Sequence, residues 1–135
     1  MPAASQESLF ARTVELVEKV DIAAPPRMVY STKPFGGMCT DGKRYIVKGV
    51  TDQSVVQAEA AAYVLAQFAG VTVPEWSFVS APAHAKYPLF GSRIISGPRD
   101  ILPLLNDDLP HYAEALSQII AFDMWIANTD RNLCN

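Results

Sequence analysis

The feature that most limits the fold is a tight turn, Thr40–Lys43 (Thr-Asp-Gly-Lys), between two short apolar runs at residues 36–39 and 45–50. Gly42 can take the positive φ angle that such a turn requires, so the two runs predict an antiparallel hairpin. Successive side chains of a strand point to opposite faces, so Tyr45, Val47 and Gly49 of the second run are expected to share one face. Lys48 is expected on the other face, together with Ile46 and Val50.

A helix is predicted after this hairpin, from about Ser54 to Gly70. Ser54 is expected to cap its N-terminus, with Gln57 as the reciprocal partner of a capping box. Gly70 is expected to end the helix in the left-handed conformation that glycine favours. The apolar face of the helix is predicted to consist of Val55, Ala58, Ala62, Leu65 and Ala69.

The rest of the chain alternates between short strand patterns and one long helix. Further strands are predicted at residues 28–30, 76–79 and 89–95, and the pattern over residues 7–22 fits either a helix or a strand. Pro110 opens a helix that runs to about Ala127. This order predicts an α+β fold, with an antiparallel sheet and one helix in residues 1–97 and the start of a helical region in residues 98–135.

Composition excludes several classes of function. The net charge of −3, without a Lys/Arg-rich run, argues against nucleic-acid binding. No secretory signal opens the sequence and no apolar run is long enough to span a bilayer, so we expect a soluble cytoplasmic protein. Cys39 and Cys134 are expected to be free thiols, although the two could form one bridge.

The strongest chemical signal lies at the end of the sequence. Asp130 and Asn135 are five positions apart directly after the long helix, which is the Asp-x-x-x-x-Asn spacing of a kinase catalytic loop. Phosphoryl transfer needs a carboxylate that orients the attacking hydroxyl and an oxygen ligand for Mg²⁺. Such a spacing also arises by chance. Asp123, within the apolar helix before the loop, is predicted to support the loop structurally.

Three upstream features appear in the order that kinase chemistry requires. Lys48 lies on a strand, where it is predicted to contact ATP phosphates, and Glu59 lies on the following helix, where it can orient the ammonium group. Gly36 and Gly37 precede this strand and are expected to form a loop whose N–H groups approach the phosphates. The alternative for Lys48 and Glu59 is an ordinary surface ion pair.

Three segments and one further residue carry a resemblance to a known family. They are residues 45–48 (Tyr-Ile-Val-Lys), Glu59, residues 70–75 (Gly-Val-Thr-Val-Pro-Glu) and residues 122–131 (Phe-Asp-Met-Trp-Ile-Ala-Asn-Thr-Asp-Arg). Together they resemble the HipA-like kinase domains of bacteria. The resemblance extends from about Met28 to the last residue. It implies a protein-kinase-like N-lobe followed by the first helix and the catalytic loop of a truncated C-lobe.

The resemblance also implies roles for individual residues. Lys48 would bind the phosphates of ATP, Glu59 would orient Lys48, Asp130 would be the catalytic carboxylate and Asn135 would be a Mg²⁺ ligand. Members of this family act as serine/threonine protein kinases, and some are toxins that arrest growth beside an antitoxin partner. A protein substrate or an antitoxin-like partner is therefore expected beside ATP and Mg²⁺.

The chain departs from the family pattern at one point. A second metal-binding Asp, the counterpart of the Asp in Asp-Phe-Gly, is absent after Asn135, so we expect the 135 residues alone to be catalytically inactive. A non-catalytic nucleotide-binding or docking module is the main alternative. A small-molecule or lipid kinase stays open as well, because phosphatidylinositol kinases have a similar loop.

Overall fold

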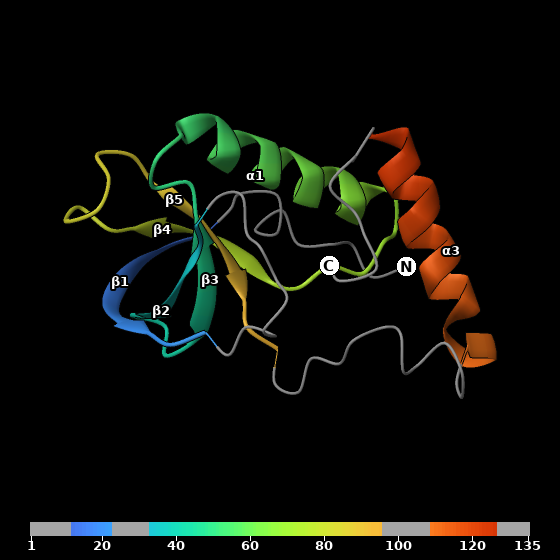
Figure 1. Cartoon of the computed structure of the whole chain (residues 1–135), viewed down its shortest axis with the longest axis horizontal. Helices are drawn as coiled ribbons and strands as arrows, with labels where there is room; N and C mark the ends of the chain where they lie inside the picture. Colours follow the sequence, from blue (N-terminus) through green and yellow to red (C-terminus); the bar gives the residue numbers. More distant parts are fainter. Residues whose placement is uncertain (1–11, 23–32, 96–108, 127–135) are drawn as a thin grey trace.

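The computed structural model describes residues 12–22, 33–95 and 109–126. Within these ranges the chain forms five strands and two helices, which confirms the predicted α+β class. The elements are β1 (Thr13–Val20), β2 (Phe35–Cys39), β3 (Arg44–Lys48), α1 (Gln53–Phe68), β4 (Trp76–Ser80), β5 (Leu89–Arg93) and α3 (Leu109–Trp125). The strands form a small barrel with α1 along one side, and α3 lies beyond the C-terminal end of α1 (Figure 1).

The barrel is closed, with the strand order β1-β2-β3-β5-β4. Four of the five pairings are antiparallel, as predicted. The fifth pairing is parallel, between β1 and β4 with Thr13 opposite Phe78, so the predicted antiparallel sheet contains one parallel pairing. Closure is favourable because it pairs the backbone groups that an open sheet leaves exposed along its two outer strands.

The predicted hairpin is present between β2 and β3. Gly42 has a φ angle of 75°, and its N–H donates to the Cys39 carbonyl oxygen at 2.9 Å. The Asp41 carboxylate accepts from the Lys43 N–H at 3.1 Å and from the Tyr45 hydroxyl at 2.7 Å. Partial burial acts to raise the pKa of Asp41, but these hydrogen bonds outweigh it and hold the pKa below its ordinary value.

The ambiguous pattern near the N-terminus resolves as the strand β1. Its pairing with β2 shifts register between Leu16 and Glu18, which marks a β-bulge, and Val17 within the bulge is 63% exposed. A bulge interrupts the strict alternation of inward and outward side chains. This interruption explains why the sequence pattern did not distinguish a strand from a helix. The strand predicted at residues 28–30 lies outside the described residues.

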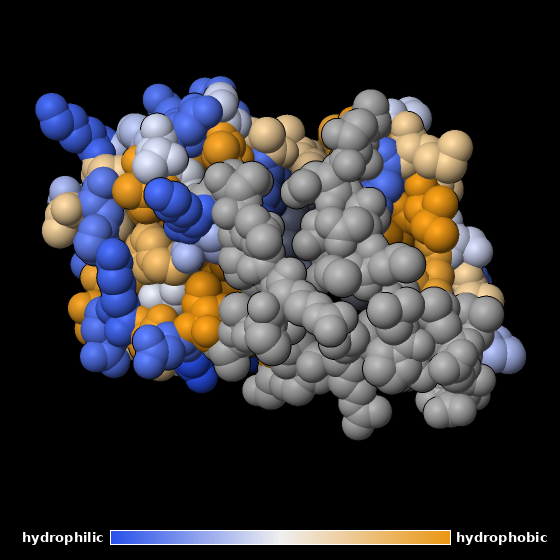
Figure 2. Space-filling view, in the orientation of Figure 1, coloured by the Kyte–Doolittle hydropathy of each residue, from blue (hydrophilic) through white to orange (hydrophobic). Residues whose placement is uncertain are grey.

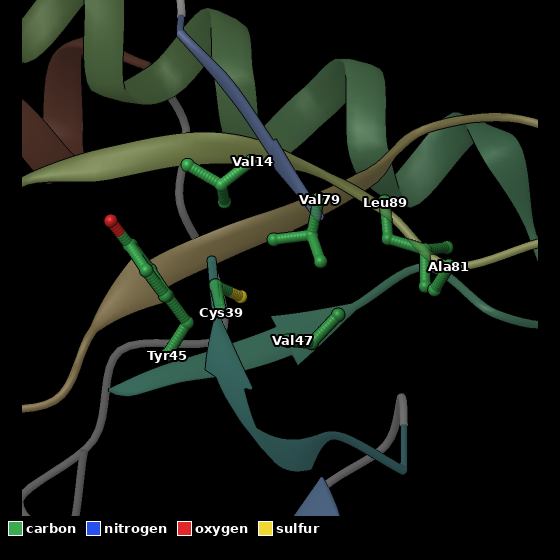
Figure 3. Close-up of a cluster of buried hydrophobic side chains, with 7 residues drawn as sticks. All are labelled: Val14, Cys39, Tyr45, Val47, Val79, Ala81 and Leu89. Atoms are coloured by element: carbon green, nitrogen blue, oxygen red, sulfur yellow. The ribbon is translucent and has the colours of Figure 1, made fainter. Parts of the chain in front are cut away.

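Side chains from all five strands or their ends fill the barrel (Figure 3). The core cluster consists of Val14, Cys39, Tyr45, Val47, Val79, Ala81 and Leu89. Cys39 is a free thiol, as predicted, and burial followed by the nearby Asp41 charge raises its pKa to about 11. Cys134 lies outside the described residues.

The start of α1 differs from the prediction. Asp52 is the N-cap residue, and its carboxylate accepts a hydrogen bond of 2.8 Å from the Ser54 N–H. Ser54 therefore lies inside the first turn, and the predicted capping box of Ser54 with Gln57 was wrong. Both Asp and Ser are favoured N-cap residues, and here the earlier of the two takes the position.

The end of α1 agrees with the prediction. Gly70 has a φ angle of 75°, and its N–H donates to the Gln67 carbonyl oxygen at 3.1 Å. The Val71 N–H donates to the Ala66 carbonyl oxygen at 2.9 Å. These two bonds form a Schellman motif, which satisfies carbonyl groups at the end of a helix.

We expect Asp52→Ala to lower the melting temperature at pH 7, whereas Ser54→Ala should lower it less because it keeps the capped N–H. The hydrogen bonds from Ser54 lower the pKa of Asp52. A carboxylate with a lowered folded-state pKa stabilises the fold above its unfolded-state pKa, and this contribution is lost as the pH falls through the folded-state value. The difference between parent and Asp52→Ala should therefore shrink in acid. Thermal melts followed by circular dichroism test this, and a larger effect of Ser54→Ala would restore Ser54 as the cap.

The buried face of α1 is not the predicted one. Its buried residues are Val56 and Ala66, while Leu65, on the predicted face, is 39% exposed. Glu59 and Tyr63 are half-buried and lie on the same side as Val56 and Ala66, at intervals of three and four residues. Apolar periodicity failed here because an alanine-rich helix has little contrast between its faces. The face of α1 that packs against the barrel therefore carries polar groups.

The predicted long helix corresponds to α3, with Pro110 in its first turn. Neither α1 nor α3, the two helices in the described part of the chain, is long and apolar enough to cross a membrane.

Candidate functional site

The candidate site is built around an ion pair between the barrel and α1. Lys48 is the last residue of β3, and its Nζ lies 2.7 Å from Oε1 of Glu59 on α1. Both side chains are 26% exposed. Tyr45 and Val47 point into the barrel, so the alternation of β3 places Lys48 on the outer side, toward α1. The sequence predicted both residues, and the structure brings them into direct contact.

The connection from β3 to α1 is tightly held directly after Lys48. Gly49 has a φ angle of 99°, and a Cβ atom there would come within 2.3 Å of the Val56 side chain. Only glycine therefore allows α1 to begin so close to the strand. The Tyr87 hydroxyl donates to the carbonyl oxygen of Gly49 at 2.8 Å and lies 3.1 Å from that of Val50. These contacts fix the backbone on which Lys48 is mounted.

A second contact holds α1 on the barrel, and the sequence analysis did not identify it. The hydroxyl oxygens of Tyr63 on α1 and Ser92 on β5 are 2.9 Å apart in a hydrogen bond. The Tyr63 ring meets the Phe90 ring edge-on, with 4.9 Å between centroids. Tyr63 follows Glu59 by four residues and so shares its face of the helix, which was the one signal available in the sequence.

A second lysine on this hairpin forms a different kind of ion pair. Lys43, just before β3, lies 2.6 Å from Glu75, and Glu75 also contacts Arg93 at 3.1 Å. The hydrogen bond from Lys43, assisted by Arg93, lowers the pKa of Glu75. One carboxylate thus binds two cations at an exposed position, where ion pairs contribute about 0–1 kcal/mol. This pair is a structural counterpart against which the Lys48–Glu59 pair can be compared.

Gly36 and Gly37 do not form the expected phosphate-binding loop. Both lie inside β2 and are buried, and β2 is paired with β1 on one side and with β3 on the other. A Cβ atom on Gly36 would come within 2.4 Å of the Val20 carbonyl oxygen, and one on Gly37 within 2.5 Å of the Leu16 side chain. The glycines are needed because β1 approaches closely, and their N–H groups belong to a strand that is bonded on both edges.

The predicted catalytic loop lies beyond the described residues. Asp130 and Asn135 both fall outside them, so their positions relative to Lys48 are not described. Asp123 on α3 is 6% exposed, in keeping with the burial expected of a structural carboxylate. In the described ranges, no group of three His, Cys, Asp or Glu side chains is placed to hold a metal ion.

The charge arrangement defines what this site can bind. The Lys48 ammonium has three N–H donors, and within the described part of the chain Glu59 takes one of them. Two donors remain for oxygen atoms of an anionic ligand such as a phosphate chain. Because Glu59 holds the ammonium in place, binding would not require a search among lysine rotamers.

The chain matches the model of a known protein family. A family model described as HipA-like kinase matches residues 27–135, which cover both Lys48 and Glu59. Searches of curated proteins and of solved structures gave no match.

Proposed function

The chain belongs to the HipA-like kinase family, and from this premise we propose that it serves ATP-dependent phosphoryl transfer to a serine or threonine of a protein. In this proposal the barrel and α1 are the N-lobe of a kinase fold, and α3 begins the C-lobe. An antitoxin-like protein is a further partner that the family suggests.

The observation that carries the proposal is the Lys48–Glu59 ion pair at 2.7 Å. Protein kinases place the phosphate-contacting lysine on their third strand and its glutamate partner on the helix that follows. Here Lys48 ends β3, the third strand in the described part of the chain, and Glu59 lies on the next described element, α1. A chance surface pair would not be expected to fall on these two elements in this order.

Each residue then has a defined task. Lys48 donates to oxygens of the α- and β-phosphates, and Glu59 keeps the ammonium aimed at them. Asp130 accepts the proton of the acceptor hydroxyl and orients its oxygen toward the γ-phosphate. Asn135 is proposed as a Mg²⁺ ligand, and Mg²⁺ would neutralise charge on the phosphates when bound.

The proposal is tested by incubating the full-length protein with Mg·ATP labelled at the γ-phosphate and analysing the protein products for phosphoserine and phosphothreonine. Transfer to either residue type, in the protein itself or in an added protein, supports the proposal. Binding of Mg·ATP without any transfer to protein, or transfer only to small molecules or lipids, would contradict it.

A second candidate function, a non-catalytic docking module, is favoured by one observation on α3. Several large apolar side chains on this helix are exposed: Tyr112 (40%), Ile120 (57%), Met124 (78%) and Trp125 (68%). Figure 2 shows hydrophobic atoms gathered over α3, at the side of the molecule away from the barrel. Exposed apolar patches of this kind mark surfaces that bind other proteins.

Sedimentation of the 135-residue chain separates the two candidates further. A docking module should self-associate or bind a separate helical partner, and Met124→Glu should abolish that association without changing the affinity for ATP. A monomer at high concentration that shows no partner binding would exclude docking and leave the phosphotransferase proposal in place.

A further inference from the structure

The contacts between α1 and β5 suggest how the ion pair of the proposed site is kept in place. Lys48 on β3 lies directly opposite Phe90 on β5 in the antiparallel register. Side chains opposite each other in such a pair are close neighbours on one face of the sheet. On α1, Glu59 and Tyr63 are one turn apart and therefore also neighbours.

These four residues form two neighbouring contacts between the helix and the sheet. The first contact is the Lys48–Glu59 ion pair at 2.7 Å, and the second is the ring contact of Tyr63 with Phe90, with 4.9 Å between centroids. The Tyr63–Ser92 hydrogen bond at 2.9 Å lies next to the second contact, since Ser92 is two residues beyond Phe90 on the same face of β5. Helix α1 is thus attached at two points one turn apart.

The second attachment point is the more firmly packed of the two. Phe90 is fully buried, and it stacks on Trp76 with 5.6 Å between ring centroids. The Tyr63 ring also meets Trp76 edge-on at 6.3 Å. The ion pair, by contrast, is partly open to solvent, where charged side chains hold each other weakly. The aromatic contact and the Tyr63 hydroxyl are therefore better suited to fixing α1 than the ion pair itself.

We propose that Tyr63 is a positioning residue that, through its hydrogen bond to Ser92, holds α1 in the rotation at which Glu59 reaches Lys48. This inference rests on the proposed phosphotransferase function for its catalytic consequence. Rotation of α1 about its axis moves Glu59 and Tyr63 together, because they lie on one face. Loss of the hydroxyl contact therefore releases the glutamate as well.

The test uses Tyr63→Phe, which keeps the ring on Phe90 and Trp76 and removes only the hydroxyl. The first readout is the rate at which Lys48 is modified by reductive methylation, followed by mass spectrometry. Lys43 is the matched control, since its side chain is 32% exposed against 26% for Lys48 and it also pairs with a glutamate. We expect the Lys48 rate to rise about five-fold, as for loss of one hydrogen bond, and the Lys43 rate to stay unchanged.

Ser92→Ala should reproduce this result, and the double variant with Tyr63→Phe should show no greater rise than either single one. Unchanged labelling of Lys48 in both variants overturns the inference. An equal rise at Lys43 also overturns it, because it indicates a general loosening of the fold. This readout needs no enzymatic activity, so it decides the inference even where Lys48→Ala shows the proposed function to be wrong.

The catalytic consequence is measured in the full-length protein with Mg·ATP. Tyr63→Phe should lower kcat about five-fold, but it should have no further effect in a Glu59→Gln background, where no ion pair remains to be positioned. A role in stability alone would reduce activity equally in both backgrounds, and that result would contradict positioning.

Discussion

Replacing Lys48 with alanine should reduce phosphate transfer from Mg·ATP by a factor of about 10²–10³, the range typical for loss of one preorganised group that stabilises a developing charge. The variant leaves no ammonium for the phosphate oxygens and leaves Glu59 without the partner that it contacts at 2.7 Å. The fold should persist, because a partly exposed ion pair contributes about 0–1 kcal/mol. Initial rates with labelled ATP in the full-length protein provide the measurement.

Lys43→Ala is the matched control for this experiment. Lys43 lies five residues earlier on the same hairpin and is paired with Glu75 at 2.6 Å, but Glu75 keeps Arg93 as a second cation. Transfer should therefore continue at nearly the parent rate. Equal losses in the two variants would show that the Lys48 pair acts only as a structural contact.

Asp130→Ala tests the other half of the same proposal. It should lower the rate of transfer by a factor comparable to that expected for Lys48→Ala while leaving the affinity for Mg·ATP nearly unchanged, because Asp130 is proposed to act on the acceptor hydroxyl. Undiminished transfer in this variant would remove Asp130 from the proposed mechanism.

Gly36→Ala should destabilise the fold by about 3 kcal/mol, the upper end of the usual cost of overpacking. The new Cβ atom would come within 2.4 Å of the Val20 carbonyl oxygen, a backbone atom that cannot turn aside as a side chain can. Relief requires β1 and β2 to move apart, which breaks the pairing of Gly36 with Val20. Denaturant unfolding followed by circular dichroism measures the loss.

Gly42→Ala separates this steric effect from the general cost of replacing a glycine. Gly42 has open space around its Cβ position but a φ angle of 75°, so only conformational strain of about 1 kcal/mol is expected. A stable Gly36→Ala protein with weakened ATP binding would instead support the original interpretation of Gly36 as part of a phosphate-binding loop.

Features set by nearby residues could be predicted from the sequence. The hairpin follows from the positive φ of Gly42, and the end of α1 follows from that of Gly70. The N-cap was misassigned because Asp52 and Ser54, two favoured cap residues, lie two positions apart. The pairing of β1 with β4 could not be found, since it joins Thr13 to Phe78 and no local pattern records such a contact.

The candidate site also contains both residues that could be predicted from the sequence and residues that could not. Lys48 and Glu59 were predicted because the order of a strand that carries lysine and a following helix that carries glutamate can be read directly from the sequence. Tyr63 and Ser92 were missed because their contact depends on how α1 is rotated against β5. That rotation was hidden by the run of alanines around Glu59. The glycines of β2 were misassigned because a glycine pair is as typical of a loop as of a strand that packs closely.

The parallel pairing of β1 with β4 also has a consequence for the order in which strand contacts form during synthesis. Residue Thr13 must wait for Phe78, 65 positions later, before β1 gains its second neighbour. At ribosomal rates of about 5–20 residues per second, this delay is roughly 3–13 seconds. During that time the nascent chain can form the β2–β3 hairpin and pair β1 with β2. β1 can therefore pair with β4 only after β4 is made, and the barrel is complete once β5, which follows β4 in the sequence, pairs with β3 and β4.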